Sequence, residues 1–188
     1  MSTKESSRDK LIKTASRLFQ LQGYHGTGLN HILKESGAPK GSLYYHFPNG
    51  KEQLAVESVQ LTAEFVRNQI QRGMDKKTDA IEAIQEFIKG MAEQFHTDDS
   101  QQGVPIATVA LETALTNEPI REACQNGYES FQQVFTEKLL QSGYEERRAR
   151  ELGIVINSII EGAFMLSFTM GSNEPLLLAA KNIPALLK

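Results

Sequence analysis

The sequence predicts an all-helical protein of about nine helices. Apolar residues recur at spacings of three and four over most of the 188 residues, which is the period of an amphipathic helix. No segment of useful length alternates apolar and polar residues in the manner of a strand. Proline, which interrupts helix interiors, occurs only six times. The length is sufficient for a helical core and allows one large or two small domains.

The first helix is expected at about residues 8–21. Its apolar positions lie on one stripe, opposite a basic face, and comprise Leu11, Ala15, Leu18 and Phe19. Gly23 is expected to end this helix, and Tyr24 is expected to pack against the two helices that follow.

A pair of short helices joined by a tight turn is predicted at residues 27–47. Thr27 is a favourable N-cap for the first of them, and apolar residues then recur at helical spacing as far as about Ser36. Gly37 supplies the stop, because glycine readily adopts the left-handed conformation that ends many helices. Two helices joined in this way are typical of DNA-binding proteins.

The second helix of the pair is expected to run from Lys40 to His46. Pro39 presets the backbone dihedral for its first turn, and Leu43 and Phe47, four residues apart, form its buried side. The outward positions are Lys40, Gly41, Ser42, Tyr44, Tyr45 and His46.

These outward residues suit a nucleic-acid partner. Lysine and hydroxyl donors at a helix N-terminus can bind phosphate oxygens, and Gly41 allows the helix backbone to approach the major groove. We expect Lys40 and Ser42 to reach base edges. Phosphate contacts are expected from Thr27, Tyr45, His46 and Lys51, and the predicted DNA-binding set also includes Gly28 and Tyr44. The alternative is an ordinary surface helix whose tyrosines pack sideways and whose lysine is only solvated.

Six further helices follow, with a polar break at residues 73–78 and a loop-like stretch at residues 96–103. They are expected at about residues 50–72, 79–95, 106–115, 119–143, 145 to beyond 168, and 175–187. Asp79 is expected to cap the second of these helices, and Pro184 to bend or interrupt the last.

Two domains are predicted. Residues 6–66 form the DNA-binding domain, with its helix-turn-helix at about residues 27–47, and residues 67–188 form a ligand-binding and dimerisation domain. The net charge of -3 would usually argue against a nucleic-acid partner. However, residues 1–52 hold eight Lys and Arg against four Asp and Glu, so this segment carries +4 and the remainder -7. The basic part of the chain is therefore the part that resembles a DNA-binding unit.

Composition disfavours a secreted or membrane protein. The single cysteine, Cys124, excludes a disulfide framework and a thiolate zinc site, and it indicates a reducing compartment. The N-terminus has no apolar segment before a cleavage site. The apolar run at residues 153–170 carries Asn157 and Glu161 near its middle, so we interpret it as a helix buried on most sides. We expect a cytoplasmic protein with no membrane partner.

No motif of an enzyme or of a cofactor site is present in the sequence. It has no Walker-type lysine, no dinucleotide glycine fingerprint and no HExxH, and its histidines are scattered. Glu112 and Glu161 are separate acids on apolar helices that could in principle form a carboxylate pair, but glutamates at a helix surface or a dimer seam are far commoner than catalytic ones. We expect no catalysis, no cofactor and no metal. A helical small-molecule carrier or chaperone, whose basic segment is incidental, is the competing class.

The stretch GAPKGSLYYHFPNGKEQL at residues 37–54 resembles the recognition-helix signature of TetR-type repressors. The first helix with its Gly23-Tyr24 turn resembles their N-terminal signature. The FPNGK spelling, the segment GVPIATVALE at residues 103–112 and the ending at residues 175–187 resemble the LmrA/YxaF group. Many members have one residue fewer between the position of Phe47 and the lysine that follows. The resemblance implies a repressor that binds a palindromic double-stranded DNA operator as a homodimer and responds to flavonoid-like ligands.

A pocket for a small aromatic effector is also implied by the resemblance. Phe and Met side chains are abundant after residue 64; most are ordinary core, but such side chains on several helices can also enclose a flat aromatic molecule. The candidates are Phe95, Thr108, Glu112, Phe131, Phe135, Asn157, Glu161 and Phe164. For each polar candidate, an ordinary structural role is the alternative.

The two last helices are expected to form the dimer seam, as they do in that family. Small residues that permit close helix approach are Gly153, Gly162, Ala163 and Ser167. The final helix offers Leu176, Leu177, Ala180, Ile183 and Leu187. Two copies of each helix would form a four-helix seam around a two-fold axis. The alternative is that both helices pack within one chain and the protein is a monomer.

Overall fold

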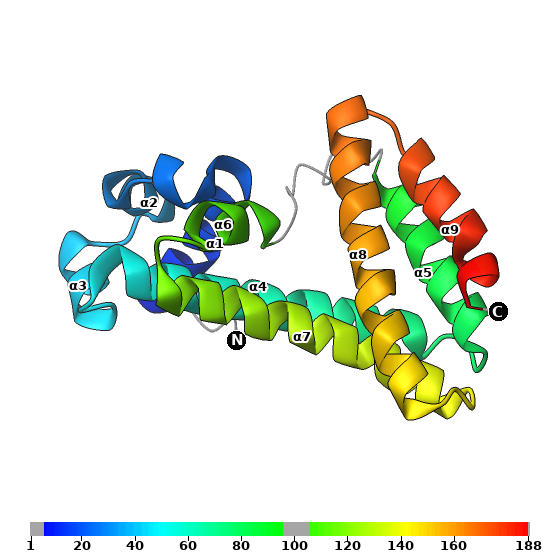
Figure 1. The fold of residues 1–188 in the computed structure, drawn as a ribbon. Helices are drawn as coiled ribbons and strands as arrows, with labels where there is room; N and C mark the ends of the chain where they lie inside the picture. The colour runs from blue at the N-terminus through cyan, green and yellow to red at the C-terminus, as the bar shows by residue number, and fades with distance from the viewer. Residues whose placement is uncertain (1–5, 96–105, 188) are drawn as a thin grey trace, which may run out of the picture. The chain divides into compact units, whose positions relative to one another are not determined.

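The computed structural model describes residues 6–95 and 106–187, and in these ranges the chain forms nine α-helices and no strand (Figure 1). The all-helical prediction is confirmed. The helices are α1 (Ser7–Gly26), α2 (Leu29–Ser36), α3 (Lys40–His46), α4 (Gly50–Met74), α5 (Ala80–Gln94), α6 (Ala107–Thr113), α7 (Glu118–Gln141), α8 (Glu146–Met170) and α9 (Glu174–Leu186). The residues expected to form the loop at 96–103 lie outside the described ranges.

The helices form two compact units. The described residues of unit 1 fall within Met1–Glu64 and Pro105–Gly127, and those of unit 2 fall within Phe65–Val104 and Tyr128–Lys188. Unit 1 therefore contains α6 and the first part of α7, which the sequence assigned to the ligand-binding domain. The reason is that α6 packs against α1, a long-range contact that no local pattern reveals.

Helix α1 is longer than expected and contains a break at Gly23. This residue has φ 74° and ψ 174°, a conformation that favours glycine, and one further helical turn follows it up to Gly26. The buried face of α1 consists of Leu11, Ile12, Ala15, Leu18 and Phe19, as its apolar stripe predicted, with Ile12 added.

In unit 2, α9 packs against both α5 and α8. Asp79 caps α5, as expected, by accepting a backbone N–H of the first turn at 2.9 Å. Two side-chain amides tie neighbouring segments together: Gln85 donates to the carbonyl of Ala180 at 2.9 Å, and Asn173 donates to the carbonyl of Ala92 at 3.0 Å. These hydrogen bonds thus fix the position of α9 and of the residue before it against α5, in addition to the apolar packing.

Helix α8 is less enclosed than expected. Only 39% of its most apolar 18-residue window is buried, so the interpretation of a helix buried on most sides is wrong. Within the described ranges it is the one helix that could cross a membrane by length and composition, a test that core helices of soluble proteins also pass. The exposed apolar side chains are Ile154, Val155, Met165, Leu166, Phe168 and Met170 on α8, and Leu177 and Leu178 on α9.

Most residues expected in the dimer seam pack inside unit 2 instead. Gly153 faces α7, where a Cβ atom would lie 2.5 Å from the Thr136 hydroxyl and 2.9 Å from the Gln132 carbonyl oxygen. The other buried members are Ala163, Ser167, Leu176, Ala180, Ile183 and Leu187. Gly162 has open space around it and Leu177 is exposed. For the buried members, the intramolecular alternative was therefore the correct one.

The last helix, α9, continues to Leu186 with Pro184 inside its final turns, so Pro184 does not interrupt it. Proline is tolerated here because few backbone hydrogen bonds remain to be lost so close to the end of a helix.

Candidate nucleic-acid interface

The turn between α2 and α3 is formed as its sequence predicted. Gly37 ends α2 in the left-handed conformation, with φ 63°, and Pro39 is the N-cap of α3 with φ -60°. Leu43 and Phe47 are completely buried and anchor α3 to unit 1. These two anchors fix which face of the short helix points outward.

The outward face of α3 carries the residues that the sequence assigned to DNA. Tyr45 and Tyr44 are 81% and 50% exposed, and Lys40 and Gly41 are also exposed, whereas Ser42 is partly covered. His46 is half-buried, with its ring edge-on to Tyr45 at 4.9 Å between ring centres. One cation and several hydrogen-bonding groups therefore share one small, well-anchored surface.

Two glycines at this surface are not required by the fold. A Cβ atom added to Gly28 or Gly41 would meet no atom within 4 Å, and neither residue has a positive φ. Gly28 is the N-cap of α2, and no side chain caps either α2 or α3. The absence of side chains here leaves the helix N-termini open to a phosphate or to a groove.

Thr27 does not have the role that the sequence predicted. It is completely buried, and its hydroxyl donates backwards to the carbonyl of Gly23 at 2.8 Å, with the carbonyl of Leu18 at 3.2 Å. The N-cap of α2 is Gly28. Thr27 is therefore a structural residue, and its side chain cannot hold a phosphate.

Lys51 lies at the start of α4 and already contacts an aromatic ring. Its ammonium is 4.3 Å from the centre of the Tyr24 ring. Burial lowers the pKa of the Lys51 ammonium, and the carboxylate of Glu112 partly offsets this. Burial, together with the nearby Glu52 carboxylate, raises the pKa of Tyr24. Tyr24 thus contacts Lys51 in α4 and Phe19 in α1, whose ring centre is 5.9 Å away, whereas its expected packing against α2 and α3 stays a prediction.

Two polar contacts next to the helix-turn-helix were not predicted from the sequence. Glu112 accepts the backbone N–H of His25 at 2.8 Å, and Asn117 donates to the carboxylate of Glu52 at 2.6 Å. The partners in each contact are at least 65 residues apart in the chain. No local sequence signal could have paired them.

The candidate effector residues are divided between the two units. Thr108 and Glu112 lie on α6 in unit 1, and the Glu112 carboxylate is engaged by His25. In unit 2, Phe131 and Phe135 are core residues with 1% and 0% exposure. The ordinary structural role therefore accounts for Glu112, Phe131 and Phe135.

The remaining candidates gather on one face of α8 and at the end of α5. The ring centre of Phe168 lies 5.1 Å from that of Phe164 and 5.3 Å from that of Phe95. On the same face of α8, Asn157 is buried, and burial raises the pKa of Glu161 to about 7. The side chains of Asn157 and Glu161 have no hydrogen-bond partner among the described residues. This face therefore combines aromatic rings with two polar side chains that are free of ion pairs and hydrogen bonds within the described residues.

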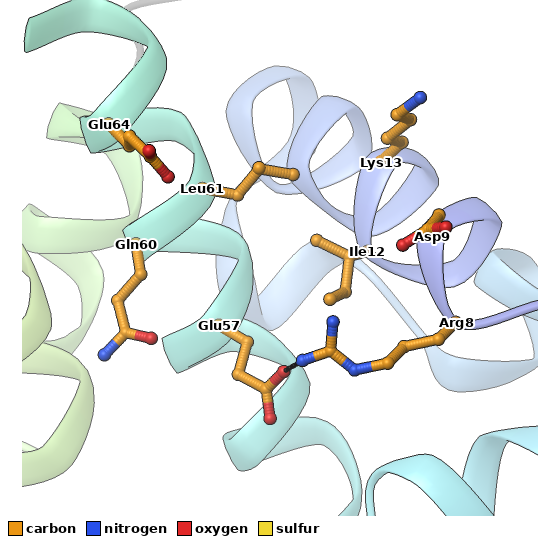
Figure 2. A pocket seen from close by; sticks show the side chains of 8 residues that line it. All are labelled: Arg8, Asp9, Ile12, Lys13, Glu57, Gln60, Leu61 and Glu64. Atoms are coloured by element: carbon orange, nitrogen blue, oxygen red, sulfur yellow. Dashed lines mark hydrogen bonds and ion pairs between the residues drawn. The ribbon is translucent and has the colours of Figure 1, made fainter. Parts of the chain in front are cut away.

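An open pocket of about 460 Å³ lies between α1 and α4 in unit 1 (Figure 2). Its walls are mostly charged, and Arg8 forms an ion pair with Glu57 across it. Ile12 and Leu61 supply its apolar part. None of the effector candidates lines this pocket, and its charged walls do not suit a flat aromatic molecule. In the described ranges, no group of three or more His, Cys, Asp or Glu side chains is placed to hold a metal ion.

Comparisons with known families match both parts of the chain. Residues 11–57 match the bacterial regulatory proteins of the tetR family, and residues 80–182 match the C-terminal domain described as transcriptional regulator LmrA/YxaF-like. The chain is 53% identical to the HTH-type transcriptional regulator YxaF of Bacillus subtilis (strain 168), over all of this chain and 98% of the relative. It is 51% identical to the HTH-type transcriptional regulator LmrA of the same strain, over 97% of each chain.

Two further similarities concern part of the sequence and the fold. The biofilm operon icaADBC HTH-type negative transcriptional regulator IcaR of Staphylococcus aureus (strain Newman) is 36% identical over 81 residues, which is 43% of each chain. The crystal structure of E. coli NemR in its reduced form has a TM-score of 0.85 over 95% of each chain, at 20% identity. The latter similarity supports the helical fold.

Proposed function

Because the chain belongs to the TetR family of bacterial transcriptional regulators, with an LmrA/YxaF-like C-terminal domain, we propose that it is a ligand-responsive repressor of transcription. Members of this family bind operator DNA and act as dimers, and they are regulators, not enzymes. In the proposal, a homodimer binds a palindromic operator in the cytoplasm and leaves it when a small aromatic, flavonoid-like effector binds.

The observation that carries the DNA-binding proposal is the anchored outward face of α3. Leu43 and Phe47 hold the helix, while Lys40 and the tyrosines point away from the core. Lys40 and Ser42 are proposed to contact bases, because they lie in the first turn of a helix that can enter the major groove. Tyr44, Tyr45, His46 and Lys51 are proposed to lie along the phosphates, with Gly28 and Gly41 allowing close approach.

The dimer proposal is supported by the exposed apolar surface of α8 and α9. Several large apolar side chains exposed on neighbouring helices are typical of a protein–protein contact surface. The proposed seam is therefore formed by the exposed residues, with open space at Gly162, and not by the buried ones named from the sequence. A two-fold dimer places two copies of α3 on half-sites separated by about one helical turn, roughly 34 Å, or a multiple of it.

The effector proposal rests on the family group and on the face of α8 that carries Asn157 and Glu161. A buried carboxyl group without a partner is costly unless it is protonated or hydrogen-bonded. A phenolic hydroxyl donates a hydrogen bond to such a group, and the rings of Phe95 and Phe164 suit a flat aromatic body. Thr108 remains a candidate in unit 1.

Selection of bound fragments from a random or genomic DNA pool tests the DNA-binding function. Two-fold symmetric sites bound by a dimer are expected. A protein that sediments as a monomer at micromolar concentration and selects sites without symmetry would contradict the proposal. Lys40→Ala should relax sequence preference, so it should lose more affinity for operator than for a scrambled duplex. Identical losses on the two duplexes would refute the base-reading role of Lys40.

Calorimetry of a flavonoid with the free protein and with its operator complex tests the response. Linkage requires DNA to weaken effector binding by the same factor by which effector weakens DNA binding, typically about 5- to 150-fold. Equal affinity in the two states would exclude induction even if the compound binds tightly. Unchanged affinity in Asn157→Ala and Glu161→Ala would exclude only these two contacts.

A further inference from the structure

Two polar contacts join the α6–α7 corner to the two ends of the helix-turn-helix. Before α2, the Glu112 carboxylate accepts the backbone N–H of His25 at 2.8 Å. After α3, the Asn117 side chain donates to the carboxylate of Glu52 at 2.6 Å. Since α2 and α3 occupy residues 29–46, the two contacts bracket the DNA-reading unit in the chain. All of these residues belong to unit 1.

The first contact is built into the backbone of α1. At Gly23 a Cβ atom would lie 1.9 Å from Oε1 of Glu112, so the carboxylate occupies the space that any side chain would need. The break in α1 at this glycine turns the N–H of His25 towards Glu112. A charged acceptor strengthens such a hydrogen bond relative to a neutral one.

In the second contact, both the nitrogen and the oxygen of the Asn117 side-chain amide form hydrogen bonds. While Nδ2 donates to Glu52, Oδ1 accepts the backbone N–H of Ile120 in the first turn of α7 at 3.0 Å. The backbone N–H of Asn117 donates to the carbonyl of Thr113, the last residue of α6, at 2.9 Å. The amide that reaches Glu52 is therefore fixed by both helices of the corner.

We infer that the α6–α7 corner holds the helix-turn-helix at both ends, and that Glu112 and Asn117 are positioning residues for operator binding. Neither side chain belongs to the outward set on α3. If one end is released, the unit samples orientations that do not fit successive phosphates and bases. The apparent affinity for operator then equals the intrinsic affinity multiplied by the fraction of molecules that retain the competent orientation. The DNA part of this inference rests on the proposed function, whereas the contact itself does not.

Hydrogen exchange of the free protein tests the contact without DNA. Glu112→Ala should accelerate amide exchange in peptides covering residues 23–36, and Asn117→Ala should do so in peptides covering residues 47–54. Asn126→Ala is the matched control, because it removes the same type of side chain at an exposed position of α7. Exchange in both variants equal to the control would overturn the inference, whatever the protein binds.

Titration against the selected operator and a scrambled duplex tests the positioning role. Each variant should lose about tenfold in operator affinity and less than about twofold on scrambled DNA, with an unchanged salt slope. Glu112→Gln keeps an oxygen that accepts the His25 N–H and should recover most of the loss. Equal losses on both duplexes, or no loss, would overturn the role.

A further variant provides a test if Glu112→Ala does not fold. Should Glu112→Ala fail to fold, Glu52→Ala removes the acceptor of the other contact and should reproduce the loss seen with Asn117→Ala. A wild-type protein that selects no DNA would instead refute the proposed function, and the exchange measurements would still decide whether the corner holds the unit.

Discussion

The ammonium group of Lys51 lies 4.3 Å from the centre of the Tyr24 ring. The lysine proposed to bind phosphate therefore starts from an aromatic partner at the end of α1. A cation over a ring face is attracted by about 0.5–2 kcal/mol, depending on its exposure. The ring thus restricts the orientations of the lysine side chain before any phosphate is bound.

Lys51→Ala should weaken binding to operator and to scrambled DNA to a similar extent. Its charge contributes through counterion release, so the slope of log affinity against log salt should fall by about one unit. Fluorescence titration at several salt concentrations measures both quantities. Lys89→Ala, which removes an exposed lysine in unit 2, is the control and should leave the slope unchanged. An unchanged slope in Lys51→Ala would place Lys51 away from the phosphates.

Gly41→Ala should leave the fold intact and weaken DNA binding. The added methyl group meets no protein atom, and alanine is favoured over glycine within a helix by about 1 kcal/mol. Thermal unfolding should therefore show equal or higher stability, while operator affinity falls. Gly90→Ala in α5 is the matched control, since its surroundings are also open, and it should not affect DNA binding. Full operator affinity in Gly41→Ala would mean that no groove approaches this backbone.

Thr27→Val should destabilise unit 1 by about 1–2 kcal/mol. The substitution conserves shape but removes the buried hydroxyl that donates to the Gly23 carbonyl at 2.8 Å. Denaturant unfolding measures the difference in free energy. Thr116→Val, where the hydroxyl is exposed, should change stability by less than about 0.5 kcal/mol. Equal effects at the two positions would show that the buried bond contributes little.

Glu161→Gln should stabilise the protein more at pH 8 than at pH 5. Burial raises the pKa of Glu161 from 4.5 to about 7, so the folded state holds a proton that the unfolded state releases between these values. Stability of the wild type is therefore lost as pH rises through this window, by up to about 3 kcal/mol, and glutamine removes that loss. Glu151→Gln, at an exposed position of α8, is the control: it retains Glu161 and should therefore keep the loss of stability with rising pH. Parallel pH profiles for Glu161→Gln and the wild type would contradict the expectation.

Cys124 should resist thiol reagents in the folded protein. Burial raises the pKa of its thiol to about 11, so at pH 8 only about one molecule in a thousand carries the reactive thiolate. Ellman's reagent should react slowly until guanidinium unfolds the chain, after which one thiol per chain should react. Prompt reaction of the native protein would show that Cys124 is accessible.

Local patterns predicted the helices and the buried and outward sides of α3 well. The turn at Gly37, the anchors Leu43 and Phe47 and the cap at Asp79 depend on neighbours within a few residues, and all are confirmed. The wrong predictions concern features that depend on contacts with other parts of the chain. Thr27 has a residue type typical of an N-cap, but the break at Gly23 places two carbonyl groups above its hydroxyl.

The apolar pattern of α8 likewise did not determine which of its faces is buried. The apolar residues of α8 are numerous enough to cover more than one face of the helix. The pattern alone therefore could not distinguish the residues that pack against α7 and α9 from those that remain exposed. Gly153 was expected to admit a partner helix, but it faces Thr136 in its own chain. The roles of Glu112 and Asn117 depended on contacts that no spacing in the sequence encodes.

The overlap between a Cβ atom at Gly23 and the carboxylate of Glu112 makes the two positions mutually dependent in any mutational history of the protein. A side chain at position 23 would displace the Glu112 carboxylate from its place beside His25, and the positive φ of Gly23 disfavours that side chain in any case. Single-substitution libraries should therefore find position 23 intolerant, while position 112 tolerates smaller residues at the expense of DNA binding. Pairwise libraries should show that the effects of the two substitutions do not add.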